Sequence, residues 1–430
     1  MSLANLVSLL GIFVLIGLAW AFSKDRRAFP WRVVLWGLGL QVAFALILLR
    51  LPVGRVVFDG IRVGIVKILS FTDAGTAFLW GNLFRTGPDM VAQLGAGSGG
   101  LTYWQVTNAA DGGLVPLGAI FVIHVLPTII FFSSLMAILY HLGLMQRVIQ
   151  GVAWVMQRSM GTSGSESLSC AGNIFVGQTE APMLIRPYVA SMTLSELMAV
   201  MVGGFATIAG GVMVAYVRFG VDAGHLLAAS VMSAPAALVM AKIMHPEKEE
   251  SRTRGRVTLD IPREYANVID AAAGGAAVGL KLAANVSAML LAFIALVAMI
   301  NAGLGLAGTS LPKLFGLLFA PLAWTLGVPW SEAHAVGNLL GTKIALNEFV
   351  AYLQMMDDVH RGILGPRSTV IATYALCGFA NFASIAIQIG GISAIAPERR
   401  ADLARLGLRA MFAGALASWL TATIAGMLTR

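Results

Sequence analysis

The chain has 430 residues, of which 58% are hydrophobic and only 12% are charged, and its mean hydropathy is +0.81. Soluble globular proteins carry about 25% charged residues, so this chain has too few polar groups to cover a water-soluble body of its size. The composition predicts an integral membrane protein and excludes disordered and disulfide-rich secreted classes, and the net charge of +8 does not indicate a nucleic-acid partner because its excess lies in short loops.

Eight stretches that lack Asp, Glu, Lys and Arg are long enough to cross a bilayer core, which takes about 20 apolar residues per helix. In chain order they are Leu3–Phe22, Val33–Leu49, Leu114–Tyr140, Leu197–Val217, Ala223–Ala241, Leu282–Ala307, Ser368–Ile392 and Ala410–Thr429. The first stretch is followed, and not preceded, by basic residues. It is therefore interpreted as an uncleaved helix and not as a signal peptide.

An even number of crossings places both termini on the same side of the membrane. With the termini outside, the cytoplasmic loops hold most of the 29 Lys and Arg residues, as the positive-inside rule requires. We therefore predict a multi-pass protein of the plasma membrane (the inner membrane of a bacterium) with both termini outside. Residues 246–281, which begin with a run of mixed charge, are predicted to form a cytoplasmic linker between two halves.

Residues 51–113 are too charged to cross the membrane simply. Arg55, Asp59 and Arg62 fall on one helical face, while most other positions nearby are apolar. This pattern favours a helix that lies in the plane of the membrane interface, followed by an external segment.

The sequence contains an internal repeat. Gly204–Ala209 reads Gly-Phe-Ala-Thr-Ile-Ala in the middle of the fourth stretch, and Gly378–Ala383 reads Gly-Phe-Ala-Asn-Phe-Ala in the middle of the seventh. Each copy follows a Gly-Asn pair and then an apolar segment that bears an acid, Glu180 or Glu348. Because the chain enters one copy after three crossings and the other after six, the copies are predicted to be inverted, which is typical of secondary transporters.

Two apolar segments, 163–186 and 333–356, hold no unbroken run long enough to span the bilayer. They are interrupted by Gly177 and Pro182 in the first segment and by Gly341 and Asn347 in the second. Non-helical backbone at bilayer depth is stable only where protein or a watery cavity satisfies its polar groups. We therefore predict two re-entrant hairpins whose tips meet at a central site.

A carboxylate at bilayer depth costs at least ~2.5 kcal/mol on insertion scales, which makes Glu180 and Glu348 candidates for a binding site. The alternative is structural ion pairing of Glu180 with Arg186, or of Glu348 with Lys343. Both acids have amide or hydroxyl neighbours, and the spans lack the cluster of basic residues that an anionic substrate would favour. A neutral solute with hydroxyl or amide groups therefore fits best. The crossing helices add the polar residues Thr207, Asn381, Ser384 and Gln388.

Three motifs resemble those of the concentrative nucleoside transporters: Gly-Gln-Thr-Glu-Ala-Pro at 177–182, Asn-Glu-Phe-Val-Ala-Tyr at 347–352 and Gly-Phe-Ala-Asn-Phe-Ala-Ser-Ile at 378–385. The resemblance extends from the first span to the last. It implies an all-α polytopic membrane protein with eight transmembrane helices, two opposed re-entrant hairpins in an inverted repeat, and assembly as a homotrimer. It also implies import of nucleosides with Na+ as the coupling ion, by an alternating-access movement.

The same resemblance implies a role for individual residues. The implied nucleobase contacts are Gly177, Gln178, Thr179, Glu180 and Val212, the implied ribose contacts are Glu348, Phe379, Asn381 and Ser384, and the implied sodium ligands are Asn173, Val176, Thr207 and Ile208. Their chemistry agrees with these roles, because a carboxylate can accept from two vicinal ribose hydroxyls and an amide can pair with a nucleobase edge. Thr207 stands where relatives carry Ser, so the hydroxyl is kept and a methyl group is added.

The resemblance further implies a division into a scaffold and a mobile transport domain. The scaffold would comprise 1–50 (first and second spans), 51–113 (interfacial helix and external segment), 114–140 (third span) and 282–307 (sixth span). The transport domain would comprise 141–245, with the first hairpin and the fourth and fifth spans, and 308–430, with the second hairpin and the seventh and eighth spans. The linker 246–281 would join the two halves.

Several alternatives stay open from the sequence. The coupling ion could be H+, the solute could be a nucleobase or a sugar, and the hairpins could line a passive channel. An intramembrane serine protease would use Ser163 of the stretch Gly161–Gly164 with His124 or His225 as its base, which must lie within hydrogen-bond reach. No enzyme activity is expected, because Ser163 precedes a charged turn at Glu166 instead of opening a long helix.

Overall fold

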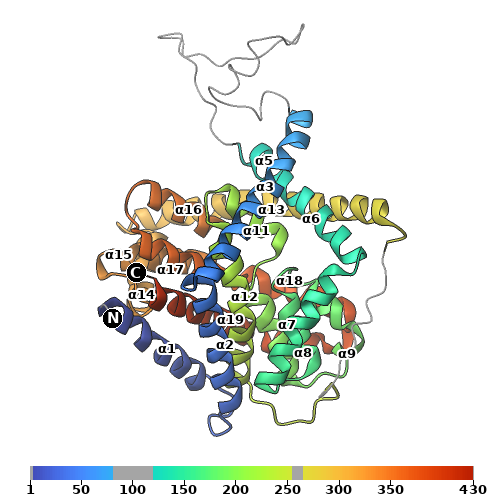
Figure 1. Ribbon diagram of the computed structural model, residues 1–430. Helices are drawn as coiled ribbons and strands as arrows, with labels where there is room; N and C mark the ends of the chain where they lie inside the picture. Colours follow the sequence, from blue (N-terminus) through green and yellow to red (C-terminus); the bar gives the residue numbers. More distant parts are fainter. Residues whose placement is uncertain (1–2, 81–119, 254–264, 430) are drawn as a thin grey trace, which may run out of the picture.

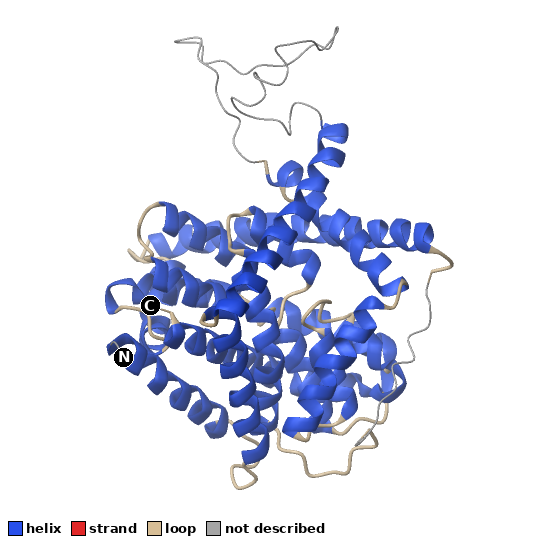
Figure 2. Cartoon of the chain, in the orientation of Figure 1, coloured by secondary structure: helices blue, strands red, loops and turns tan. Residues whose placement is uncertain are grey.

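The computed structural model describes residues 3–80, 120–253 and 265–429, and these form helices and loops with no strand among them (Figures 1 and 2). This confirms the predicted all-α class. The first half contains α1 (Leu3–Ala21), α2 (Trp31–Leu49), α3 (Pro52–Trp80), α5 (Phe121–His124), α6 (Leu126–His141), α7 (Leu144–Met160), α8 (Gly164–Gly172), η2 (Ala181–Ile185), α9 (Arg186–Val189), α10 (Leu194–Ala206), α11 (Gly210–Arg218) and α12 (Ala223–Met244). The second half contains α13 (Val268–Gly305), α14 (Leu311–Thr325), α15 (Trp330–Ala345), α16 (Glu348–His360), α17 (Pro366–Leu376), α18 (Phe382–Ile395), η3 (Pro397–Arg399) and α19 (Arg400–Leu428).

The arrangement of buried and exposed helices is that of a membrane protein. Seven helical spans within the described residues are long and apolar enough to cross a bilayer, or eight if the bent pair α14–α15 is one span. The spans formed by α10–α11, α12 and α19 are almost wholly buried, whereas α2, α6 and α13 expose most of their surface although they are strongly apolar. Exposed apolar surface of this extent indicates contact with lipid or with partner chains.

The two ends of the described chain meet at the same end of the molecule (Figure 1). The guanidinium group of Arg367, in the first turn of α17, donates to Asn5 Oδ1 at 3.0 Å and to the carbonyl oxygen of Thr429 at 2.9 Å. The proximity of the two chain ends agrees with the even number of crossings predicted from the sequence.

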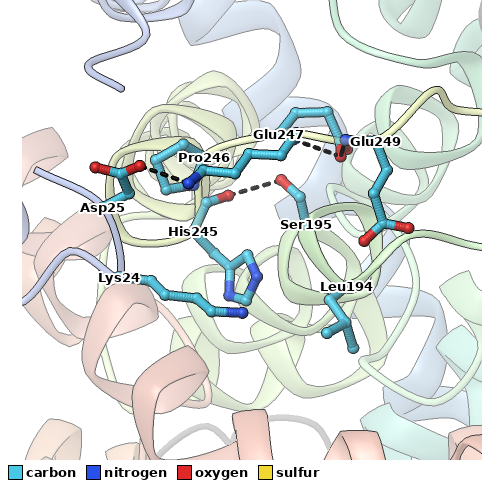
Figure 3. A pocket seen from close by; sticks show the side chains of 9 residues that line it. Lys24, Asp25, Leu194, Ser195, His245, Pro246, Glu247 and Glu249 are labelled. Atoms are coloured by element: carbon cyan, nitrogen blue, oxygen red, sulfur yellow. Dashed lines mark hydrogen bonds and ion pairs between the residues drawn. The ribbon is translucent and has the colours of Figure 1, made fainter. Parts of the chain in front are cut away.

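At the other end of α1, the turn into α2 is joined to the end of α12. Ser23 Oγ donates to the carbonyl of Ile243 at 2.6 Å, and the N–H of Lys24 donates to the carbonyl of Met244 at 2.9 Å. An ion pair of 2.5 Å between Asp25 and Lys248 closes the contact. Lys24, Asp25 and Lys248 line a cavity of about 190 Å³ together with Ser195 and His245 (Figure 3).

The fourth and seventh predicted spans are not continuous helices, and this corrects the sequence prediction. The chain is non-helical between α10 and α11 and again between α17 and α18, so both copies of the repeat, Gly204–Ala209 and Gly378–Ala383, lie at breaks. Asn381 therefore does not sit in mid-helix. It is the N-cap of α18, and its Oδ1 accepts the N–H of Ser384 at 2.9 Å, which satisfies a backbone donor that a helix end leaves unpaired.

Both predicted hairpin segments fold as two helical pieces around a break. In the first, Ser163 and Glu166 form a capping box at the start of α8, and a non-helical tip separates α8 from η2. In the second, Asn347 caps α16 directly after the end of α15. The prediction that Gly341 interrupts this segment is wrong. Gly341 lies inside α15, where an added Cβ would approach the Cβ of Phe315 to 2.4 Å, so it serves the packing of α15 on α14.

Other boundaries differ from the predicted ones. The helix α13 begins at Val268, so the second part of the predicted linker is helical, and α14 was not anticipated. The helix α3 has 29 residues and runs at a steep angle to α13 (Figure 1). Its portion Val63–Trp80 is apolar enough to cross a membrane, so its place in the interface stays a prediction. The external segment 81–119, with the start of the third predicted span, lies outside the described residues.

Candidate functional site

The tips of both hairpin segments and both helix breaks face a single cavity of about 160 Å³. All nine residues named from the sequence as substrate contacts line it. The structure adds Ala209, Asn347, Phe349 and Ile387, and it adds an apolar wall from α13 that consists of Leu282, Val286, Met289 and Leu290. The cavity is therefore bounded by elements from both halves of the chain.

Glu348 is the first residue of α16 and is only 3% exposed. Its Oε1 accepts from the hydroxyl of Tyr216 at 3.0 Å, and its Oε2 accepts from Nδ2 of Asn381 at 3.1 Å. The alternative ion pair with Lys343 does not form among the described residues. The Lys343 ammonium group instead donates to the carbonyl of Ala375, near the end of α17, at 3.0 Å.

Tyr216 is a site residue that sequence reasoning missed. It is fully buried in α11, with its ring packed at 4.8 Å from that of Phe349 and at 4.4 Å from that of Tyr352, measured between centroids. Aromatic contacts at these distances hold a ring in place. Its partner Glu348 lies 132 residues away in the sequence, so no local signal could have joined the two.

The carboxylate of Glu180 shapes the first tip. Its Oε2 accepts the N–H of Gly177 at 2.7 Å, and its side chain is exposed toward the cavity that it lines. Arg186 is exposed and forms no ion pair with Glu180 in the part of the chain that the structure describes. Glu180 and Glu348 thus face the same cavity, and Glu348 is held there by hydrogen bonds from Tyr216 and Asn381.

A chain of hydrogen bonds joins the two tips. Gln388 Nε2 donates to Gln178 Oε1 at 3.1 Å, and Gln178 Nε2 donates to Ser384 Oγ at 3.1 Å. The N–H of Ser384 donates to Asn381 Oδ1, and Asn381 Nδ2 in turn donates to Glu348. Buried polar networks of this kind rigidify a site when their members are satisfied.

The four residues implied as sodium ligands lie where the first tip meets the break after α10. Asn173 is fully buried, and its Nδ2 donates to the carbonyl of Ser169 at 3.1 Å while its Oδ1 has no partner among the described residues. Thr207 Oγ1 donates to the carbonyl of Gly203 at 2.8 Å, which leaves its lone pairs available. The carbonyl oxygens of Val176 and Ile208 accept no hydrogen bond from the described chain.

These groups fit a small hard cation. All of them are oxygen atoms, and unwound backbone at the ends of broken helices is where transporters bind Na+. A buried amide oxygen without a protein partner is costly, so Asn173 Oδ1 has the chemistry of a cation ligand. The contact between Gly210 N–H and the carbonyl of Phe175, 3.0 Å long, holds the tip against the start of α11.

The residues of the protease alternative have other partners. Ser163 is the N-cap of α8, and its Oγ accepts the N–H of Glu166. The ring of His225 interacts with the hydroxyl of Tyr374 at 3.3 Å, and that of His124 interacts with the backbone of Ile120 at 3.0 Å. Ser163 therefore has a structural role at the base of the hairpin segment.

Comparison with known proteins identifies the family. The Na+ dependent nucleoside transporter N-terminus matches residues 10–83, a nucleoside recognition region matches 122–223, and the Na+ dependent nucleoside transporter C-terminus matches 225–426. An uncharacterized transporter of Haemophilus influenzae is 42% identical and aligns over 98% of this chain and 97% of its own length. The chain belongs to the Na+-dependent nucleoside transporter family. The members of this family are transporters and not enzymes.

Other members of the Na+-dependent nucleoside transporter family extend the comparison. Sodium/nucleoside cotransporter 1 of mouse is 42% identical over 99% of this chain, which spans 64% of the length of the mouse protein. The structure of CNTnw in an inward-facing substrate-bound state has a TM-score of 0.90 at 43% identity over 100% of both chains. A variant of CNTnw in an outward-facing state has a TM-score of 0.88 at 42% identity, over 100% of this chain and 98% of that one. The resemblance to concentrative nucleoside transporters is thus confirmed.

Proposed function

We propose that this protein imports nucleosides by symport with Na+, through an alternating-access movement of a transport domain. The observation that carries the proposal is the cavity between the two tips, in which a carboxylate held by two donors faces amide, hydroxyl and carboxylate side chains. The similar mouse protein is named a sodium/nucleoside cotransporter, and the similar CNTnw structure is described as substrate-bound.

The ribose end of the site would be formed by Glu348, Phe379, Asn381 and Ser384. Each carboxylate oxygen of Glu348 accepts one hydrogen bond from the protein and keeps lone pairs for two vicinal hydroxyls of a ribose. No Lys or Arg lines this cavity among the described residues, which supports an uncharged substrate over a phosphorylated one.

The nucleobase end would be formed by Gly177, Gln178, Thr179, Glu180 and Val212. Polar groups of the first tip can pair with the edge of a base, while Val212 and the apolar wall from α13 can cover its face. This division into a polar edge and an apolar face matches the surface of a planar heterocycle.

Na+ would bind to Asn173, Val176, Thr207 and Ile208 and so connect the first tip to the break after α10. Because the tip also contributes the nucleobase contacts, ordering of the tip by the ion would favour nucleoside binding. A coupling of this kind is reciprocal, and it is the physical basis of symport in this proposal. In the alternative, a proton-coupled transporter, H+ would take the place of Na+ as the coupling ion.

The larger arrangement is proposed on the same basis. The hairpins 163–186 and 333–356 would enter the membrane from opposite faces as an inverted repeat, with both termini outside and the linker 246–281 in the cytoplasm. The transport domain, 141–245 and 308–430, would move against the scaffold of a homotrimer. CNTnw has been described in both inward-facing and outward-facing states, which supports such a movement.

Titration calorimetry of the purified full chain with uridine and adenosine tests the coupling. The dissociation constant of the preferred nucleoside is expected to fall by about tenfold or more as NaCl replaces choline chloride at constant ionic strength, with KCl as the control. An affinity that follows pH instead of Na+ would favour coupling to H+. If neither nucleoside binds in any salt, the substrate class is wrong.

Uptake into proteoliposomes tests the transport cycle. An inward Na+ gradient should drive accumulation of labelled nucleoside above its outside concentration, because a coupled carrier transfers the free energy of the ion gradient to the solute. Equilibration that is independent of the gradient would support the passive channel and refute symport.

A further inference from the structure

Gln388 of α18 has no role in the proposed function, although it is fully buried beside the site. Its Nε2 makes two contacts, one to the carbonyl oxygen of Met201 at 3.1 Å and one to Oε1 of Gln178 at 3.1 Å. Its own Oε1 is buried and has no partner among the described residues. A glutamine at this position therefore contributes through its donor end alone.

The carbonyl of Met201 determines how these two amides are turned. A carbonyl oxygen only accepts, so the end of Gln388 that faces it must be the NH2 group. The second hydrogen of that group points to Gln178, which must therefore present its oxygen to Gln388. The NH2 group of Gln178 is left at its other end, where one hydrogen is donated to Ser384 Oγ at 3.1 Å.

The backbone leaves these side chains no space to shift away from each other, although an amide can still turn in place because its two ends are similar in size. A Cβ added to Gly204, the first residue of the repeat, would lie 2.7 Å from Gln388 Nε2 and 2.9 Å from Gln178 Cβ. Both distances are shorter than real Cβ contacts, so the pair is packed directly against glycine backbone. The surroundings thus fix where the Gln178 side chain lies, and the hydrogen bond from Gln388 fixes which way its amide is turned.

We propose that Gln388 is a specificity-determining positioning residue, which holds the amide of Gln178 so that the cavity receives an N–H donor. The inference rests on the proposed function, in which Gln178 contacts the nucleobase. A fixed donor selects bases that carry an acceptor at the edge facing it. Uridine offers a carbonyl oxygen at position 4 where cytidine offers an amino group, and inosine and adenosine differ in the same way at position 6.

The ratio of dissociation constants for uridine and cytidine tests the inference, because the two ligands share the ribose and differ in the polarity of one edge. The wild-type protein should bind uridine about tenfold more tightly, which is the effect of one hydrogen bond replaced by an unpaired donor. Gln388→Met removes the donor and frees Gln178 to turn, so the ratio should fall toward one.

Gln388→Glu gives a sharper test, because this substitution should reverse the preference for uridine over cytidine. An ionised carboxylate only accepts, and a protonated one has a single hydrogen, which the carbonyl of Met201 takes. In both protonation states Gln178 must turn its NH2 group toward the new side chain and its oxygen toward the cavity. Cytidine should then bind more tightly than uridine.

Gln41→Met is the matched control. Gln41 is also fully buried, its Nε2 also donates to a backbone carbonyl, that of Gly37 at 3.2 Å, and its Oε1 also has no described partner. It does not line the cavity, so its substitution should leave the ratio unchanged.

The outcomes separate the inference from the function on which it rests. Absence of binding of both nucleosides to the wild-type protein would refute the proposed function. Binding of both with equal affinity, or tighter binding of cytidine, would refute the inference alone, and this measurement needs no variant. A ratio that is the same in both folded Gln388 variants as in the wild type would refute it as well.

Discussion

Replacement of Glu348 by glutamine is the most direct perturbation of the cavity. The carboxylate accepts from Tyr216 at 3.0 Å and from Asn381 at 3.1 Å. Asn381 cannot turn its amide, because its Oδ1 is held by the N–H of Ser384, whereas a tyrosine hydroxyl both donates and accepts. The introduced amide is therefore expected to keep its oxygen toward Asn381 and to turn its NH2 group toward Tyr216.

This rearrangement retains both hydrogen bonds within the protein, so the substitution should lower the affinity for the ligand and not the stability of the fold. An NH2 group has no lone pair to offer a ribose hydroxyl, and the negative charge is lost. A hydrogen bond to a charged group contributes about 1.5–3 kcal/mol, so the dissociation constant of uridine should rise by about 10- to 150-fold. Because the protein contacts survive, the thermal unfolding midpoint should change by less than about 3 °C.

Titration calorimetry with uridine and with 2′,3′-dideoxyuridine, which lacks both hydroxyls, isolates the contact as a thermodynamic cycle. The substitution should weaken the binding of uridine and leave the binding of dideoxyuridine nearly unchanged. Asp357→Asn is the matched control, since Asp357 is exposed on the same helix in an ion pair with Arg361. Wild-type affinity for uridine in the Glu348 variant, or an equal loss for both ligands, would show that the carboxylate is structural.

Three further predictions concern the ion, the packing and the pH dependence. Asn173→Leu removes a buried oxygen that has no described partner, so the affinity of this variant for uridine should no longer depend on the Na+ concentration. A dependence on Na+ as strong as in the wild type would exclude Asn173 as a sodium ligand. Gly204→Ala should lower unfolding stability by about 1–3 kcal/mol through overpacking, whereas Gly151→Ala, on α7 in open space, should be neutral or stabilising in thermal melts. Burial and the Lys24 ammonium lower the pKa of His245 to about 4. The unfolded state therefore binds the extra proton between about pH 6.5 and 4, and stability is lost as pH falls through this range; His245→Gln should flatten this part of the melting-temperature profile, and an unaltered profile would contradict the assignment.

The membrane class and most spans could be predicted because a bilayer imposes its requirement on each segment separately. A crossing helix must be long and apolar whatever its neighbours are, so the runs that became α2, α12 and α13 are visible in the sequence. The repeat was visible for a related reason, because two copies of one unit keep similar residues at equivalent places.

The breaks in the fourth and seventh spans were missed because apolar composition does not distinguish an unwound segment from a helix. Gly378–Ala383 is largely apolar like its flanks, yet the chain is non-helical from the end of α17 at Leu376 to the start of α18 at Phe382. Asn381 and Asn347 carried a local signal, since asparagine is a preferred N-cap, and both cap helices at the cavity. Interpreted as caps, they would have located the break in the seventh span and the tip of the second hairpin segment, whereas α11 begins after Ala209, which carries no capping side chain.

The sequence by itself determined the apolar runs, the capping residues and the pair of acids, because each of these depends on residues close together in the chain. Only the tertiary structure decided what the acids and amides contact. Glu348 meets Tyr216 across 132 residues, and Gln388 meets Gln178 across 210. Hydrogen bonds extend about 3 Å and depend on direction, so partners that distant become known only when the packing of the helices brings them together.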